Sequence, residues 1–412
     1  MSAVSPQVDS REAWVVAAAS FVLNAVALGA TILIIVSLKE IAVTEGWPRE
    51  APSLVYAATI TGTGIGGILM GWWSDRKDVR WPVTLGAFGI GLGSILASQA
   101  AEAWQMALAG AFLLGGCGSA AFFSPLIANA TRWFVRRRGL AVAFVAAGQN
   151  LAGSLWPPVF SAIGLLGGWR LSFLIFGLLA FVTILPLTWF LRQPAPAAPA
   201  ASQTQGGVNR VLGLPAHFVH AILFAMQVLC CLAMAAPFVH GPAHVSDLGH
   251  SMALGATMLT VILTVSIASL LTLGYIADRI GGLRTLVIAS AAQACSLLLY
   301  ANFESLPMLY ASAVVFGLGF GGLTPSYAIV IRELFPAHQV GWRIASTFLG
   351  GTLGMALGGW LAGRIFDATG HYHLAFYLGF VFNLANLALG GFLLWRWLGG
   401  HGSDLRAALR RV

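Results

Sequence analysis

Charged side chains are scarce in this sequence. Asp, Glu, Lys and Arg make up 9% of the residues, against about a quarter in a typical soluble domain. Stretches without any of them run over residues 13–38, 51–74, 81–101, 103–131 and 139–169. Each is long enough to cross a hydrocarbon core of about 30 Å as a helix of about 20 residues. The stretches are apolar on every face, which argues against a soluble core. We therefore expect an integral membrane protein.

Patterns that bind metals or nucleotides are also lacking. The chain has four cysteines, all inside apolar segments and without metal-ligand spacing: Cys117, Cys230, Cys231 and Cys295. We expect these thiols to be reduced and buried. One group of titratable residues follows an apolar segment: His240, His244, Asp247 and His250. Because Pro242 interrupts this group, we interpret it as a solvated external loop rather than a metal site. The glycines lack the Gly-Lys-Ser/Thr ending of a phosphate-binding loop. We therefore expect neither a cofactor nor an ATP-driven step.

The apolar pattern predicts twelve transmembrane helices. We place them near residues 13–38, 51–73, 81–101, 104–131, 139–165, 170–191, 215–240, 252–276, 285–302, 306–333, 342–365 and 372–397. An even number of crossings puts both termini on the same side of the membrane. Eighteen of the 22 Lys and Arg residues fall on that side, and the other four are Lys39, Arg49, Arg170 and Arg364. The positive-inside rule then makes both termini cytoplasmic. This placement favours a plasma membrane, the inner membrane of a bacterium, and argues against nucleic acid as a partner of the +8 chain.

The chain divides into two halves of six helices each. Residues 193–214 are rich in Pro, Ala, Ser and Gln without a hydrophobic period, which is typical of a flexible linker. We expect an N-terminal bundle at 1–192, this cytoplasmic linker, a C-terminal bundle at 215–398 and a cytoplasmic tail at 399–412. Short patterns recur between the halves: Gly71, Asp75 and Arg76 reappear 203 residues later as Gly274, Asp278 and Arg279. Such duplication is a feature of carriers that rock one half against the other around a midplane site.

The doubled pattern resembles the major facilitator superfamily, whose hallmark is a Gly-x-x-x-Asp-Arg loop between helices 2 and 3 that recurs between helices 8 and 9. The two copies here consist of Gly71, Asp75, Arg76 and Arg80, and of Gly274, Asp278, Arg279 and Arg284. Asp78 stands where the family usually has a glycine. The resemblance implies an all-α fold of two pseudo-symmetric six-helix bundles. It also implies that both copies belong to a conformational switch.

Three stretches are similar to monocarboxylate transporters and oxalate–formate exchangers: residues 36–41, residues 132–141, and residues 239–240 followed by 247–249. However, the charges that these families use are missing. Leu270 stands at the family's helix 8 arginine, Ser266 at its aspartate, and Ile32 at the helix 1 lysine; residues 344–363 contain no lysine. Either helix N-termini and hydroxyl groups hold an anion, or the solute is neutral or lipophilic. Both alternatives stay open at this point.

Polar and aromatic residues deep in the helices are candidates for lining a substrate cavity. They are Asn24, Thr31, Phe122, Ser124, Gln149, Asn150, Gln227, Ser266 and Tyr327. For each, the competing interpretation is an interhelical hydrogen bond. Glycines spaced by four are expected to let helices approach closely. They are Gly62, Gly66, Gly67 and Gly71 in the first half, and Gly350, Gly354 and Gly358 in the second.

The sequence therefore predicts a secondary transporter that moves a small organic solute without ATP by alternating access. A monocarboxylate-like acid is the first expected solute class, and efflux of lipophilic compounds is the alternative. No nucleophile, base and metal ligand converge in the pattern, so we do not expect an enzyme. We expect a monomer whose partners are its solute and the bilayer.

Overall fold

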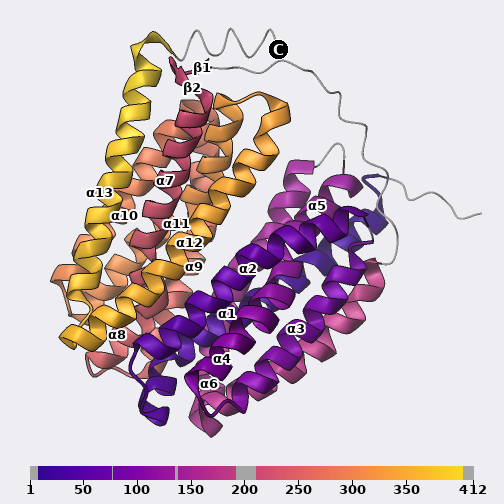
Figure 1. The fold of residues 1–412 in the computed structure, drawn as a ribbon, viewed down its shortest axis with the longest axis vertical. Coiled ribbons are helices and arrows are strands. Elements are labelled where there is room, and N and C mark those ends of the chain that lie inside the picture. Colours follow the sequence, from indigo (N-terminus) through magenta and orange to yellow (C-terminus); the bar gives the residue numbers. More distant parts are fainter. Residues whose placement is uncertain (1–7, 77, 135–137, 192–209, 402–412) are drawn as a thin grey trace, which may run out of the picture. The chain divides into compact units, whose positions relative to one another are not determined.

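The structure is a computed structural model that describes residues 8–76, 78–134, 138–191 and 210–401 (Figure 1). Among these residues, eleven helices are long and apolar enough to cross a membrane. One of them, α6, contains a break, so twelve apolar helical segments result. The predicted all-α fold of twelve apolar helices is confirmed. Residues 193–209 of the predicted linker and 402–412 of the predicted tail lie outside the described residues.

The chain folds into two compact units. Unit 1 comprises Met1–Ala200 and His250–Thr260, and unit 2 comprises Ala201–Gly249 and Val261–Val412. The helices before the linker are α1 (Arg11–Glu45), α2 (Glu50–Arg76), α3 (Arg80–Ser98), α4 (Ala103–Leu108), the π-helix η1 (Ala109–Gly118), the 3₁₀-helix η2 (Ser119–Ala121), α5 (Phe123–Trp133), α6 (Arg138–Leu187) and the 3₁₀-helix η3 (Thr188–Leu191). The predicted bundle limits at 192 and 215 remain predictions.

The second half starts with a small hairpin. The elements after the linker are β1 (Arg210–Val211), β2 (Leu214–Pro215), α7 (Ala216–Ala235), the π-helix η4 (Ala236–His240), α8 (Gly241–Asp247), α9 (Met252–Ile280), α10 (Gly282–Asn302), α11 (Leu306–Leu334), α12 (Ala337–Thr369), α13 (His373–Arg396) and the π-helix η5 (Trp397–His401). Strands β1 and β2 pair antiparallel around a turn at Leu212 and Gly213. The Arg396 guanidinium donates two hydrogen bonds to the Leu212 carbonyl, at 3.1 and 2.9 Å. The last residues of the predicted linker are therefore tied to the end of α13.

The first helix is longer than predicted. We expected it to end at residue 38, before the charged pair Lys39 and Glu40, but α1 continues to Glu45 and is capped by Gly46 in the left-handed region (φ 66°). The reason lies in the partners of these charges. One Glu40 carboxylate oxygen accepts a hydrogen bond from the Trp169 backbone N–H at 3.0 Å. Since a helix tolerates a charge that finds a partner, the charged pair does not stop it.

The hydrogen bond between Glu40 and Trp169 also stabilises the break in α6. Gly167 and Gly168 have non-helical dihedral angles there, with Gly168 at φ 74°. This break separates two helical arms that correspond to the predicted helices at 139–165 and 170–191. The arm that starts at Trp169 has unpaired backbone N–H groups in its first turn, and the Glu40 carboxylate satisfies one of them.

The fourth predicted helix is irregular rather than continuous. We expected one helix over residues 104–131, but the backbone passes from α4 through η1 and η2 before α5 begins. Phe122 has φ −106° and ψ −60° at this junction. π-Helical turns of this kind often occur at functional sites. Periodicity of apolar residues could not predict the change, because α- and π-helical segments bury similar residues.

Glycine spacing marks most, but not all, of the close helix contacts. A Cβ atom on Gly62 or Gly66 would collide with the backbone of η1, and one on Gly354 or Gly358 would collide with the backbone of α7. These predicted contacts are confirmed. The prediction is wrong for the pair Gly67 and Gly71, where an added Cβ would meet no atom of the described residues within 4 Å.

Candidate functional site

Asn24 places a carboxamide in the middle of α1, fully buried against the first arm of α6. Its Nδ2 donates to the Ser20 carbonyl at 3.2 Å and to the Val145 carbonyl at 3.4 Å. Both neighbours accept hydrogen bonds, so the amide nitrogen faces them and Oδ1 points elsewhere. This oxygen is buried and has no partner among the described residues. Gly148 lets α6 approach α1 closely here, because a Cβ there would lie 2.2 Å from the Phe21 carbonyl oxygen and 3.1 Å from the Asn24 Cβ.

Gln227 repeats this arrangement in unit 2. It lies in α7, is 6% exposed, and its Nε2 donates to the Cys231 sulfur at 3.4 Å. The Oε1 atom is buried without a partner in the described part of the chain. Gly351 of α12 makes room for it, since a Cβ there would lie 2.7 Å from Nε2.

The two pairs of a buried amide residue and a glycine on the facing helix occupy equivalent positions in the duplicated sequence. Gln227 follows Asn24 by 203 residues, and Gly351 follows Gly148 by the same 203. The packing repeats as well, because α1 lies against α6 in unit 1 and α7 lies against α12 in unit 2. The duplication inferred from short motifs is thus visible in side-chain contacts. A buried acceptor without a donor is uncommon in proteins and calls for a reason.

The other candidates in unit 1 are more dispersed. Thr31 is buried in α1, and Phe122 is buried with its ring against Gly86, where a Cβ would lie 2.6 Å from it. Gln149 and Asn150 are half-buried in α6, and Ser124 is exposed at the start of α5. These residues therefore do not form one cluster through any described hydrogen bond.

Two of the predicted cavity residues in unit 2 form hydrogen bonds within that unit. The Ser266 hydroxyl donates to the Leu263 carbonyl of its own helix at 2.7 Å. The Tyr327 hydroxyl donates to Asn386 Oδ1 at 3.4 Å, and Asn386 Nδ2 donates to the Ser290 hydroxyl at 3.0 Å and to Asn383 Oδ1 at 3.2 Å. All four members of this polar cluster are buried. The sequence reasoning missed Asn383 and Asn386, although polar residues in the last apolar helix were a visible signal.

The doubled motif lies on helix ends rather than in loops. Gly71 and Arg76 belong to the last turns of α2, and Gly274 and Arg279 to those of α9. Each arginine folds back onto an aromatic ring one turn earlier. The Arg76 guanidinium carbon lies 4.1 Å from the Trp72 ring centroid, and that of Arg279 lies 4.3 Å from the Tyr275 centroid.

The remaining motif residues differ between the copies. Arg80 opens α3 and lies over the Trp81 ring at 4.8 Å, and its backbone N–H donates to Asp78 Oδ1 at 3.1 Å. Arg284 is exposed on α10. The side chains of Asp75 and Asp278 lie outside the described part of the structure, so their partners in the switch remain a prediction.

Half of the histidine group is not the solvated loop that we expected: His240 and His244 are buried, whereas Asp247 is exposed and His250 is half-buried. His240 is fully buried; its Nε2 lies 2.8 Å from the Gly359 carbonyl and its Nδ1 3.1 Å from the Tyr372 hydroxyl. His244 is 3% exposed. Helical turns in η4 and α8 continue through Pro237 and Pro242, and this continuation buries the imidazoles. Among the described residues no group of three or more His, Cys, Asp or Glu side chains is arranged to hold a metal ion.

Comparison with known protein families identifies the family of this chain. The family model of the Major Facilitator Superfamily matches residues 18–301 and, in a second match, residues 223–405. Together the matches cover nearly the whole chain. The chain belongs to this superfamily.

Relatives within the superfamily agree with the expected subgroup. The chain is 27% identical to the MFS-type transporter pynF of Aspergillus niger over 79% of this chain and 74% of that protein. It is 26% identical to monocarboxylate transporter 13 of Bos taurus over 92% of this chain and 88% of that one. The superfamily member is thus a membrane-embedded transporter of small molecules that is close to the monocarboxylate transporter group, and it is not an enzyme.

A solved structure agrees on the fold. A bacterial homolog of the human lysosomal transporter Spinster superposes with a TM-score of 0.75, covering 93% of this chain and 97% of that one. At 14% identity, this likeness concerns the fold alone.

Proposed function

We propose that this superfamily member carries a small monocarboxylate-like acid in its protonated, uncharged form by alternating access and without ATP. The observation that carries the proposal is the matched pair of buried carboxamide oxygens. Among the residues that the structure describes, neither Asn24 Oδ1 nor Gln227 Oε1 has a hydrogen-bond donor, and each lies in the first apolar helix of its repeat. A protonated carboxylic acid or a hydroxy acid brings O–H groups that such acceptors can bind.

The missing charges support the uncharged form. The positions at which monocarboxylate carriers hold charged residues are Leu270, Ser266 and Ile32 here. Moving an ionised carboxylate away from water without a cationic partner costs several kcal/mol. The protonated acid avoids that penalty, and one hydrogen bond to a carboxamide contributes about 0.5–1.5 kcal/mol.

The repeated contacts support alternating access. The pairing of a buried amide residue with a glycine on the facing helix and the arginine–aromatic contacts recur at the offset of 203 residues. Two equivalent units can exchange roles as the carrier opens to one side and then the other. We further propose that both termini are cytoplasmic, from the distribution of Lys and Arg.

The test is flux into phosphatidylcholine vesicles that contain the purified protein. We expect uptake of radiolabelled lactate without ATP, with a rate that rises as the pH on the lactate side falls and the protonated fraction grows. Lactamide, which keeps the hydroxyl group and cannot ionise, should compete at all pH values. Strict dependence on ATP would reject the transport mechanism. Uptake limited to lipophilic compounds, with no acid transported at any pH, would favour the second candidate, efflux of lipophilic compounds. That candidate is supported by the uncharged residues Leu270, Ser266 and Ile32 at the positions where the family holds charges.

A further inference from the structure

Each unit links the end of its third apolar helix to the start of its last one through a side chain at an equivalent position. In unit 1, Arg170 in the second arm of α6 donates to the Ser98 and Ala100 carbonyls at the end of α3, each at 2.9 Å. In unit 2, His373 is the first residue of α13, and its Nδ1 lies 2.9 Å from the Ala301 carbonyl of α10. His373 follows Arg170 by 203 residues, and the two carbonyls of Ser98 and Ala301 are separated by the same 203. The duplication has kept the link and changed the side chain that makes it.

A carboxylate contacts the cationic side chain in both links. The Arg170 guanidinium lies 3.0 Å from the Glu45 carboxylate of α1. His373 Nε2 lies 2.8 Å from Oε1 of Glu304, which is in the loop between α10 and α11. A guanidinium stays charged in proteins, whereas imidazole is the side chain that gains or loses its proton between about pH 5 and pH 8. The cation of the unit 2 link can therefore titrate, and that of the unit 1 link cannot.

The two contacts of His373 together require an extra proton. A carbonyl oxygen only accepts hydrogen bonds, so the Nδ1 that faces Ala301 carries a hydrogen. In a neutral imidazole the other nitrogen then has a lone pair and no hydrogen. Here that nitrogen, Nε2, faces a carboxylate oxygen of Glu304 at 2.8 Å, and an ionised carboxylate is an acceptor as well. A hydrogen bond at this distance needs one proton, either on Nε2 or on the carboxyl group.

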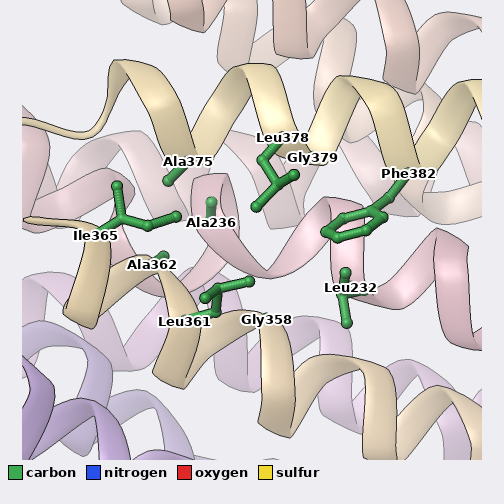
Figure 2. A pocket seen from close by; sticks show the side chains of 10 residues that line it. All are labelled: Leu232, Ala236, Gly358, Leu361, Ala362, Ile365, Ala375, Leu378, Gly379 and Phe382. Carbon is green, nitrogen blue, oxygen red and sulfur yellow. The ribbon is translucent and has the colours of Figure 1, made fainter.

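The pair lies at the edge of an apolar interior. Figure 2 shows Ala375 of α13 with Ala362 and Ile365 of α12 around a small hollow, and the side chains drawn there contain only carbon. His373 lies two residues before Ala375, and its side chain is 26% exposed, against 57% for Glu304. Solvent can therefore deliver a proton to the pair and remove it.

Other charged and titratable groups on the elements beside His373 include His371 before α13, His244 and Asp247 of α8, His240 of η4, and Arg364 and Asp367 near the end of α12. Two of these rings are close: the centroid of the His371 ring lies 5.1 Å and that of the His244 ring 6.1 Å from the centroid of the His373 ring. The Glu304 carboxylate is in hydrogen-bond contact with His373, so it is the group that favours the imidazolium most directly. His371 is exposed and titrates in solvent, so the test below includes a control for it.

We propose that His373 and Glu304 bind one proton between them and form a pH-sensitive link between the end of α10 and the start of α13. With the proton present, both contacts of the imidazole are hydrogen bonds. Without it, the Nε2 lone pair faces the carboxylate, and of the two contacts only that with Ala301 remains favourable. Since α10 and α13 pack along each other, the link stabilises unit 2 at acidic pH and loses this contribution as the pH rises.

The test is thermal unfolding of the full chain in mild detergent at about pH 6 and at about pH 9, on either side of the range in which imidazole titrates. The informative variant is Glu304→Gln. Its amide can donate to the neutral imidazole, and its oxygen can accept from the imidazolium, so the contact no longer needs the proton. We expect the unfolding temperature of the wild type to lie about 2 °C above that of Glu304→Gln at the lower pH and about 2 °C below it at the higher pH.

A second variant, His373→Arg, gives unit 2 the side chain that unit 1 has at this position. Because the guanidinium keeps its charge, the unfolding temperature of this variant relative to the wild type should rise by about 2 °C from the lower to the higher pH. Unfolding is measured without any flux, so this result is independent of the proposed transport of an acid.

A matched control exists between the same two helices. The Tyr377 hydroxyl of α13 donates to Asn302 Oδ1 of α10 at 2.7 Å, without an imidazole or a carboxylate, so Tyr377→Phe should lower the unfolding temperature equally at both pH values. His371→Gln, made in the wild type and in Glu304→Gln, should leave their reversal with pH unchanged. Parallel pH curves for the wild type and Glu304→Gln overturn the proposal, as does a His373→Arg variant whose stability follows pH as the wild type does. Loss of the reversal in the His371→Gln background overturns the assignment of the proton to His373.

Discussion

The Glu40 carboxylate accepts a hydrogen bond from the Trp169 backbone N–H at 3.0 Å and so caps the second arm of α6 from the end of α1. Beside it, Arg170 lies 3.0 Å from the Glu45 carboxylate and donates to the Ser98 and Ala100 carbonyls, each at 2.9 Å. Two carboxylates and one guanidinium therefore join three helices at this end of unit 1.

We predict that Glu40→Ala lowers the free energy of unfolding by about 1–2 kcal/mol, the usual effect of losing a side-chain cap. Unfolding in mild detergent, followed by tryptophan fluorescence against denaturant, measures this change. Glu45→Ala is the control. It removes a partly exposed ion pair with Arg170, and such pairs contribute about 0–1 kcal/mol. If Glu45→Ala destabilised the protein more than Glu40→Ala, the capping role would be rejected.

The first helix also shows what the sequence could and could not predict. Its apolar run predicted a membrane helix, and the duplicated glycine, aspartate and arginine predicted the fold. The predicted end of this helix was wrong because Lys39 and Glu40 were interpreted without their partners. The partner of Glu40 is the Trp169 backbone, which lies far along the chain. The π-helical segment after α4 was missed for a related reason, since it depends on how α2 and α3 pack against η1.

The sequence predicted individual residues of the candidate site, but it did not predict which of them lie in equivalent positions. Asn24 and Gln227 were chosen as polar residues in apolar helices. Their equivalence emerged only when Gly148 and Gly351 were seen against them. Tyr327 was chosen on the same grounds, yet its hydroxyl is engaged with Asn386. Tyr327 differs from Asn24 and Gln227 in where its polar group points. The sequence of a largely apolar helix does not specify this direction.

The aromatic cluster of unit 1 leads to a second prediction. Phe176 is 1% exposed and contacts the rings of Trp156 and Phe160. Phe176→Ala should lower the free energy of unfolding by about 3–5 kcal/mol, because a buried ring is lost and a cavity remains. Chemical unfolding in detergent measures it. Leu178→Ala, at an exposed position of the same helix arm, should change stability by less than about 1 kcal/mol. Equal losses in the two variants would contradict the cluster's role.

The third prediction concerns Tyr327. Since its hydroxyl donates to Asn386 inside unit 2, Tyr327→Phe should lower the free energy of unfolding by about 1 kcal/mol and leave the KM for lactate unchanged. Thermal unfolding and initial rates of lactate uptake measure the two effects. A large rise in KM with unchanged stability would instead assign Tyr327 to the substrate cavity, as the sequence suggested.

The fourth prediction tests the paired carboxamides. Asn24→Leu and Gln227→Leu keep the approximate size of each side chain and remove its acceptor oxygen. If each oxygen accepts a hydrogen bond from the protonated acid, each variant should raise the KM for lactate by about tenfold, equivalent to about 1.4 kcal/mol. Gln99→Leu, at an exposed residue, is the control and should leave KM unchanged. Asn24 also donates to two carbonyls, so thermal unfolding must accompany the kinetics. A loss of stability in Asn24→Leu without a change in KM, together with unchanged kinetics in Gln227→Leu, would mean that both amides serve helix packing alone.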